Sequence, residues 1–449
     1  MKYIFFILAL ITFLNCSKDS TTAPIIDNPV DYANSKITSF SKNAGISGET
    51  ITLIGENLTT DASKVALKFD ANLATIVSAS ATEIKFILPV SAKTIPELKL
   101  TISNNNIQNK VVNEYTGNIG ILPAPVYNSW QAIESTLIKQ VGTNSPLVFK
   151  IQHIDSKKLY LTAEGNGGSV WRTIDGGISF NIWSLNDVTY KNGYWALEDG
   201  RGWASVSYFG VFNIPASGNP TGPYANPITG SNDNFYTVYV ENNLTTGTVI
   251  NGDGKVFTTT NGTSFNLVYT CPYITSTSGY KFLDGVNFSI NNNAIWAAGT
   301  VRTNGSYYRP TVIYKNNVSN VWEEYLFPEE QYYNIFPRQL VFTSTTNGYL
   351  LVNKYTSSGF VFVSSKIFHT TDGGFSWAEV YNGTYLQNIA FKDASVGWAT
   401  SGNKIFKTVD GGATWALDFT NNQIIRNISY KNNEVWAFSL DKFFKYRIQ

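Results

Sequence analysis

The sequence is poor in the residues that build metal sites and covalent active sites. Its 449 residues include two cysteines, Cys16 and Cys271, two histidines, His153 and His369, and one methionine. The histidines lie far apart in the chain, which argues against a His/Cys metal site and against a Cys–His nucleophile pair. We therefore expect neither a metal nor a cofactor.

The chain also has few charged residues, and neither sign of charge is in large excess. Only 14% of the residues are charged, and the formal net charge is +1. Nucleic-acid-binding proteins usually carry a clustered basic surface, so no nucleic-acid partner is expected. Aromatic residues also make up 14% of the chain, and there are 35 glycines. This composition favours many short strands joined by tight turns over helices.

Long apolar runs are absent after the N-terminus. The run from Tyr3 to Leu14 is too short to span a bilayer as a mature helix, and it has the form of a signal peptide. It stops at Asn15-Cys16, and in this it resembles a bacterial lipoprotein signal, in which Cys16 becomes the lipidated first residue. An ordinary secretory peptide cut nearby is the alternative. We assign residues 1–15 to the signal peptide and 16–35 to the lipidated cysteine and a flexible tether.

The residues after Cys16 bear on location. Ser17-Lys18-Asp19-Ser20 resembles the export signal of surface-displayed lipoproteins in some Gram-negative bacteria. The resemblance implies an outer-membrane protein that is anchored by lipid and faces the cell exterior. Two or more acyl chains would anchor it stably. Cys271 would then be the only thiol, and we expect it to be a buried, small apolar side chain.

Residues 36–118 alternate apolar and polar side chains in short segments. Strands are predicted at 50–54, 65–69, 74–77 and 83–88, with turn residues about every ten positions, as in a β-sandwich. The segments GETITLIGENL (48–58) and TEIKFILP (82–89) resemble the strands of IPT/TIG domains, which are immunoglobulin-like modules. The resemblance implies a spacer or a binding accessory. Residues 119–127 read as a linker.

A short motif then repeats through residues 128–449. It occurs at 170–180, 256–265, 367–377 and 405–415, centred on Asp175, Asn261, Asp372 and Asp410, with a degenerate copy at 312–322. Asp372 and Asp410 are 38 residues apart, and Asp175 and Asn261 are 86 apart, which is two units. A period near 40 in an all-β sequence indicates propeller blades.

These motifs resemble Asp boxes, the BNR repeats of sialidases, sortilin and photosystem assembly factors. The resemblance implies turns in which Asp175, Asn261, Asp372 and Asp410 hold the backbone, while Trp377 and Trp415 pack between blades. Asn261 supports a structural role, because a catalytic carboxylate would not tolerate Asn whereas an Asx turn would.

The predicted fold class is therefore all-β, an immunoglobulin-like sandwich followed by a β-propeller. Seven blades are favoured, and six or eight stay open because the second unit is irregular. The units are placed at 148–183, 187–213, 233–270, 279–327, 337–381, 386–419 and 424–449, with an x-x-W-A element as the second strand. The last unit lacks an outer strand. We predict that residues 128–134 pair with 443–449 and close the ring, which removes exposed edges.

An enzyme is not favoured by the sequence. A sialidase should show an R-I-P motif and an arginine cluster, and the chain has no R-I-P and few arginines. The pairs Glu323-Glu324 and Glu329-Glu330 could supply an acid and a base, but solvated loop carboxylates are the commoner explanation. No P-loop, G-x-S-x-G or H-E-x-x-H motif is present.

Binding has the better basis. Long loops at the face opposite the box turns are rich in aromatic residues and arginine, which suit stacking on sugars or anchoring a protein. We expect glycan capture first, a protein-binding adhesion or assembly factor second, and a glycoside hydrolase third. The candidate ligand-binding residues are Arg201, Trp203, Tyr208, Arg302, Tyr307, Tyr308, Arg309, Tyr332, Tyr333, Phe336 and Arg338.

Overall fold

The structure is a computed structural model. It describes residues 32–91, 93–103, 105–107, 119–134, 147–164, 169–184, 191–206, 210–215, 221–225, 235–252, 254–273, 287–291, 294–301, 307–315, 319–439 and 442–449. Over these ranges the regular structure is strands and two short 3-10 turns, and no helix is long and apolar enough to cross a membrane. The predicted signal peptide and Cys16 lie outside the described residues.

The first domain is a β-sandwich. One sheet has the strand order β1 (Lys36–Phe40), β3 (Thr50–Glu56), β7 (Glu83–Ile87), β6 (Thr75–Ala79), and the other has the order β5 (Asn72–Leu73), β4 (Val65–Phe69), β8 (Leu98–Ile102), β9 (Asn105–Ile107). Alternate residues of β3 are buried, and Leu53 shares one apolar core with Phe86 of the neighbouring strand β7 and with Leu67 of β4 in the other sheet. This is the period-two pattern of strands that are buried on one face.

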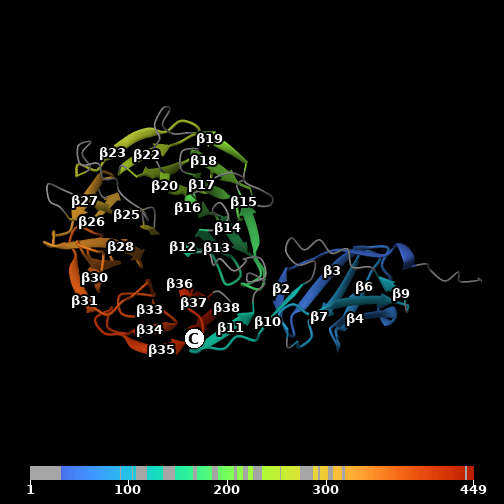
Figure 1. The fold of residues 1–449 in the computed structure, drawn as a ribbon. Coiled ribbons are helices and arrows are strands. Elements are labelled where there is room, and N and C mark those ends of the chain that lie inside the picture. The colour runs from blue at the N-terminus through green and yellow to red at the C-terminus, as the bar shows by residue number, and fades with distance from the viewer. Residues whose placement is uncertain are drawn as a thin grey trace, which may run out of the picture.

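The second domain is a ring of four-stranded antiparallel sheets (Figure 1). Seven such sheets are described, and we number them as blades 1 to 7. From inner to outer strand they are β12 (Leu147–His153), β13 (Leu159–Glu164), β14 (Ser169–Thr173), β15 (Asn181–Ser184); β16 (Lys191–Ala196), β17 (Gly202–Val206), β18 (Gly210–Ile214), β19 (Thr221–Ala225); β20 (Phe235–Val240), β21 (Gly247–Asn251), β22 (Lys255–Thr259), β23 (Asn266–Thr270); β24 (Asn287–Asn291), β25 (Ala294–Val301), β26 (Arg309–Lys315), β27 (Trp322–Leu326); β28 (Tyr333–Phe342), β29 (Gly348–Thr356), β30 (Phe362–Thr370), β31 (Ala378–Gly383); β32 (Asn388–Phe391), β33 (Gly397–Ser401), β34 (Lys404–Thr408), β35 (Ala416–Thr420); and β36 (Ile425–Lys431), β37 (Glu434–Ser439), β38 (Lys442–Arg447), β11 (Trp130–Glu134). The predicted all-β fold class is confirmed.

The last blade takes its outer strand from the start of the ring. β11 pairs antiparallel with β38, from Trp130 opposite Tyr446 to Glu134 opposite Lys442. The Trp130 ring packs on Phe419 of blade 6, and its Nε1 donates to Asp418 Oδ2 at 2.7 Å. The predicted closure is therefore confirmed, and β11 gives blade 7 the outer strand that completes its four-stranded sheet.

The second unit differs from the prediction. Blade 2 runs from Lys191 to Ala225 rather than from 187 to 213, because its fourth strand is β19. Trp195-Ala196, predicted to lie in a second strand, belongs to the inner strand β16, whereas the equivalent elements of other units lie in β25, β29, β33 and β37. A Trp-Ala pair in the sequence indicates a buried strand, but it does not indicate which strand of the blade it is. The sequence of this blade has no box turn from which the strand order could be inferred.

The first domain is docked on blade 1. A two-stranded parallel sheet joins β2 (Ala44–Ile46) to β10 (Gly120–Leu122), and Ala44 and Leu122 share an apolar cluster with Ile178. A Cβ added to Gly120 would lie 2.6 Å from Ile178 Cδ1, so a larger residue here would force the Ile178 side chain to move. The sandwich is thus packed directly against the ring (Figure 1).

Candidate ligand-binding surface

The box turns use their polar side chains internally. Asp410 Oδ1 accepts bonds from Thr408 Oγ1 at 2.8 Å and Thr414 N at 2.9 Å, and Oδ2 accepts Thr414 Oγ1 at 2.6 Å. Gly411 and Gly412 adopt φ of 73° and 93°, a region that favours glycine. Both carboxylate oxygens are therefore committed to the turn.

The other copies of the turn follow the same plan. Asp175 and Asp372 accept equivalent bonds, and Asn261 Oδ1 accepts from Thr263 N at 3.0 Å and Ser264 N at 2.8 Å. The Trp415 ring packs on Phe391, and its Nε1 donates to Gly412 O at 2.9 Å. Trp377 is placed equivalently, with its Nε1 3.1 Å from Gly374 O. These residues hold the turns and the blade contacts.

Blade 5 is longer than its neighbour. β28, β29 and β30 have 10, 9 and 9 residues, whereas β32, β33 and β34 of blade 6 have 4, 5 and 5. Tyr333 pairs with Thr356, and Tyr355 pairs with Phe362, next to the turn from β29 to β30. Successive turns of an antiparallel sheet lie at opposite ends, so this extension is at the end away from the box turn of Asp372.

Aromatic side chains cover this extension. We call the set the aromatic ridge, defined as Tyr307, Tyr308, Tyr332, Tyr333, Phe336, Tyr355, Phe360, Phe362 and Tyr385. The rings contact one another: Tyr307 lies 6.0 Å from Tyr332, Tyr308 5.3 Å from Phe336, and Phe336 6.2 Å from Phe360 between centroids. Phe362 lies 5.9 Å from Tyr355 and 5.1 Å from Tyr385. Such offset and edge contacts are the arrangements that aromatic pairs prefer, and they stabilise the positions of the rings.

Two ridge residues are both exposed and strained. Tyr332 is 62% and Phe360 56% exposed, and their φ angles are 68° and 51°. Aromatic residues rarely adopt this left-handed conformation, and such outliers concentrate at functional sites. Backbone bonds from Ser357 N to Tyr332 O and from Thr356 N to Val361 O, both 2.9 Å, hold the two turns.

A network of ion pairs links the strands that carry the ridge. Glu330 accepts hydrogen bonds from Lys354 and from Lys366, and Lys366 also lies 3.0 Å from Glu379. Lys354 Nζ lies 3.7 Å from the centre of the Tyr333 ring. Burial alone would raise the pKa of Glu330, but the bonds from the two lysines outweigh it, so that the pKa lies below its usual value. Glu330 is thus an anchored carboxylate and is unsuited to act as a general acid.

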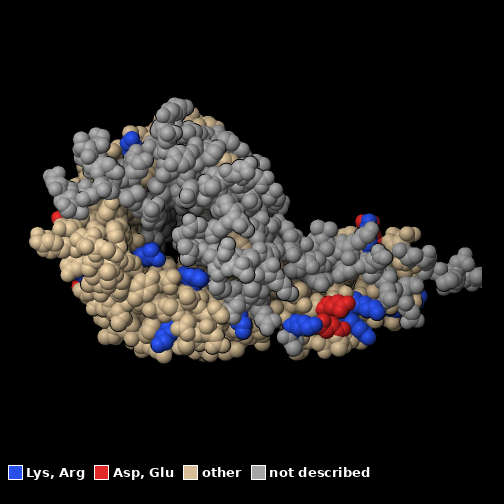
Figure 2. Space-filling view, viewed as in Figure 1, with Lys and Arg blue, Asp and Glu red and all other residues tan. Residues whose placement is uncertain are grey.

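Several predicted site residues meet at the ridge. Tyr307, Tyr308, Tyr332, Tyr333 and Phe336 belong to it, and Arg309 and Arg338 lie on the adjoining strands β26 and β28. Tyr208 and Arg302 lie outside the described residues. Among the residues that Figure 2 colours, charged side chains are few and scattered on the visible propeller face, which is hollowed at the centre of the ring.

Two predicted residues are elsewhere. Trp203 was expected on an exposed loop, and this is wrong: it is 4% exposed in β17 and packs against Phe265 of blade 3. Arg201 precedes β17 at the box-turn end, where its Nε donates to Asp199 Oδ2 at 2.6 Å. Both errors follow from the misplaced second unit, because residues 202–206 are a strand and not part of a loop.

Four ridge residues were not singled out in the sequence. Tyr355, Phe360 and Phe362 lie in or beside the turn from β29 to β30, and Tyr385 follows β31. The segment GFVFV (359–363) after two serines was the available signal, because an apolar run at a turn is unusual in a soluble domain. Among the described residues, no group of three His, Cys, Asp or Glu side chains could hold a metal ion.

Comparisons with known proteins bear on the folds of the two domains and do not identify a ligand. The model of the IPT/TIG domain family matches residues 35–117. No curated protein sequence matches the chain. Similar solved structures include YCF48 from Cyanidioschyzon merolae, with 13% identity, 71% of this chain and 98% of that chain covered, and a TM-score of 0.46.

Two further structures extend the comparison. An auxiliary nutrient binding protein from Bacteroides thetaiotaomicron is 12% identical, with 92% of this chain and 97% of that chain covered and a TM-score of 0.38. The WD40 β-propeller domain of Doa1 is 11% identical, with 71% and 97% covered and a TM-score of 0.43. Likeness at this distance carries nothing about function. Residues 35–117 thus match the IPT/TIG family, and the ring that follows has a β-propeller fold.

Proposed function

We propose that this protein is a non-catalytic binding protein that captures a glycan on the aromatic ridge. The observation that carries the proposal is the pair of exposed rings, Tyr332 and Phe360, which are held by strained turns on a rigid blade. Function carried by loops on a rigid scaffold is the usual arrangement in such folds.

The chemistry of the ridge suits sugars. Aromatic faces pack against the apolar faces of sugar rings, and tyrosine hydroxyls with Arg309 and Arg338 nearby can supply polar contacts. The rings are already fixed by their neighbours, so little conformational freedom is lost on binding. Glu330 is held by two lysines, which makes a glycoside hydrolase the least favoured of the three functions.

A protein partner is the second candidate, and one observation favours it. Phe360, Val361 and Val363 are 56%, 62% and 42% exposed at the tip of the ridge, and their side chains carry no polar group. Exposed apolar groups of this kind mark protein contact sites.

The proposal includes the location. Lipidation of Cys16 would anchor the chain to the outer membrane, and the tether and the sandwich would hold the propeller away from it on the cell exterior. The sequence after Cys16 supports this location.

A glycan array tests the proposed function, together with a hydrolysis assay on every glycan that binds. We expect binding without turnover, and we expect Tyr332→Ala and Phe360→Ala each to weaken it about tenfold or more. Phe375→Ala is the matched control, because Phe375 is 50% exposed but lies in the box turn of the same blade. Turnover, or equal losses in all three variants, would contradict the proposal. Absence of glycan binding, with capture of a protein that depends on Phe360, would establish the second candidate.

A further inference from the structure

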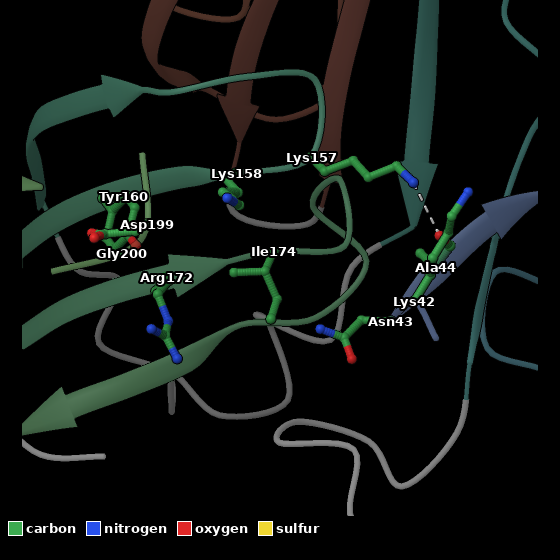
Figure 3. A pocket seen from close by; sticks show the side chains of 10 residues that line it. All are labelled: Lys42, Asn43, Ala44, Lys157, Lys158, Tyr160, Arg172, Ile174, Asp199 and Gly200. Atoms are coloured by element: carbon green, nitrogen blue, oxygen red, sulfur yellow. Dashed lines mark hydrogen bonds between the residues drawn. The ribbon is translucent and has the colours of Figure 1, made fainter. Parts of the chain in front are cut away.

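A cavity of about 350 Å³ lies where the first domain meets blades 1 and 2 (Figure 3). Lys42, Asn43 and Ala44 line it from the sandwich, and Lys157, Lys158 and Arg172 are among the residues that line it from the propeller. Ile174, the residue before Asp175, is also in its wall, so the cavity is at the box-turn end and the aromatic ridge is at the other end. Its volume falls in the lower range of small-molecule sites.

The lining is strongly positive for a chain with so little charge. Lys42, Lys157, Lys158 and Arg172 face a single carboxylate, Asp199. Asp199 is compensated by Arg201, whose Nη2 lies 2.6 Å from Oδ2, and Lys42 is paired with Glu49. Arg172 is only 2% exposed, so its charge lies inside the protein and is weakly screened by solvent.

Lys157 and Lys158 are held in place by their own turn. Asp155 Oδ1 accepts the backbone N–H groups of both lysines at 2.7 Å, which fixes the turn between β12 and β13. The two side chains then diverge: Lys157 Nζ donates to Ala44 O at 3.2 Å, the bond drawn in Figure 3, and Lys158 Nζ donates to Glu198 O at 2.7 Å.

These two partners are neutral carbonyls. In the part of the chain that the structure describes, neither ammonium group forms an ion pair with a carboxylate within 4.0 Å. Each ammonium has three donors, and the carbonyl accepts one of them. Neither lysine therefore has a direct ionic partner among the described residues, although Glu49 is near enough to Lys157, and Asp199 to Lys158, for a longer-range attraction between the charges.

We infer that this cavity binds a small oxyanion, the carboxylate, sulfate or phosphate group of a ligand about as large as a monosaccharide. Lysine ammonium groups form charge-assisted hydrogen bonds to all three anions. The walls of this cavity come from both domains. The inference is independent of the proposed function of the ridge.

Isothermal titration calorimetry of the purified protein in chloride buffer tests the inference, with glucuronate, sulfate and inorganic phosphate as probes and glucose as the neutral control. We expect at least one anion and not glucose to bind, with affinity that falls as salt rises. The anion that binds distinguishes a carboxylate from a sulfate or phosphate source.

Matched lysine variants assign the site. Lys158→Gln should weaken anion binding about tenfold, and Lys157→Gln should do the same. Lys404→Gln, at an exposed lysine of blade 6, and Tyr332→Ala in the ridge should leave it unchanged. Lys158→Gln keeps the bond between Lys157 and Ala44, so thermal melting should show an intact fold. No binding by any anion, or binding unaffected by both cavity lysines, overturns the inference.

Discussion

The same turn residue behaves differently at two places in the ring. Asp175 and Asp410 accept the same kinds of hydrogen bond, but Asp175 is 1% exposed and Asp410 is exposed. Burial raises the pKa of Asp175, against the bonds from Ser179 and Thr173. The bonds from Thr414 and Thr408 lower the pKa of Asp410 to about 2. The difference comes from the first domain, which packs over blade 1 and removes solvent from its box turn.

At the residue scale, Asp410→Ala should lower the melting temperature by a few degrees and leave ligand affinity unchanged, because both carboxylate oxygens serve the turn. Asp410→Asn should cost less, since Asn261 occupies the same position in its own turn. The folded pKa of Asp410 lies below the unfolded value of 3.8. Its stabilising contribution is therefore complete above that value and is lost as the pH falls through about 2.

Thermal melts at neutral pH and at about pH 2 check this prediction. The difference between the wild type and Asp410→Ala should be large at neutral pH and should shrink in acid. Lost ligand binding with an unchanged melting temperature would show instead that Asp410 belongs to a binding site.

At the scale of elements, single strands and turns could be predicted from the sequence, whereas the pairing of strands from distant segments was harder to predict. Val65–Phe69 alternates and forms the predicted strand, and the acid, glycines and tryptophan of 405–415 specify a turn. Blade 2 has no such turn, and its strand order depends on contacts that sequence spacing does not reveal. About half of the ridge was predicted: Tyr307, Tyr308, Tyr332, Tyr333 and Phe336 were expected to bind a ligand, but the three long strands that group them with the other four rings depend on pairing across blade 5.

The ridge extension depends on one carboxylate. Glu330 joins the segment before β28 to Lys354 on β29 and to Lys366 on β30. We expect Glu330→Gln to lower the free energy of unfolding by about 1–2 kcal/mol. The expected loss is this small because the Glu330 side chain is 28% exposed, so solvent screens its charge in part. Lys366, with 9% side-chain exposure, would keep only Glu379 as an ionic partner.

Urea denaturation measures the effect. Glu329→Gln is the control, because Glu329 is next to Glu330 in the chain and its side chain is exposed. The control should stay within experimental error of the wild type. Equal stability of the two variants would mean that the lysines find other partners and that Glu330 does not hold the extension.

At the scale of the whole molecule, the two ends of the ring and the first domain meet at one seam. β38 pairs with β11, and β10 precedes β11 and packs on blade 1. Lys445 of β38 is fully buried there, where its Nζ donates to Ser156 O of blade 1 at 2.7 Å. It also lies 3.9 Å from the centre of the Trp436 ring. The seam thus encloses a lysine whose nearest carboxylate, Glu434, is 4.0 Å away and already paired with Arg447 at 2.9 Å.

We expect this lysine to make the stability of the closed ring depend on pH. Burial lowers the pKa of Lys445 from 10.5 to about 7, with Glu434 opposing the shift. The unfolded chain therefore binds one more proton than the folded chain between about pH 7 and 10, so stability should rise with pH across this window. The free energy of unfolding should increase by up to about 1.4 kcal/mol for each pH unit.

Lys445→Met keeps the length of the side chain and removes the charge, so it should flatten this rise. Urea denaturation at about pH 7 and about pH 9 measures the slope, with Lys404→Met as an exposed-lysine control. If the variant keeps the wild-type slope, Lys445 is not the titrating group, and the seam is closed by its strand pairing and apolar contacts alone.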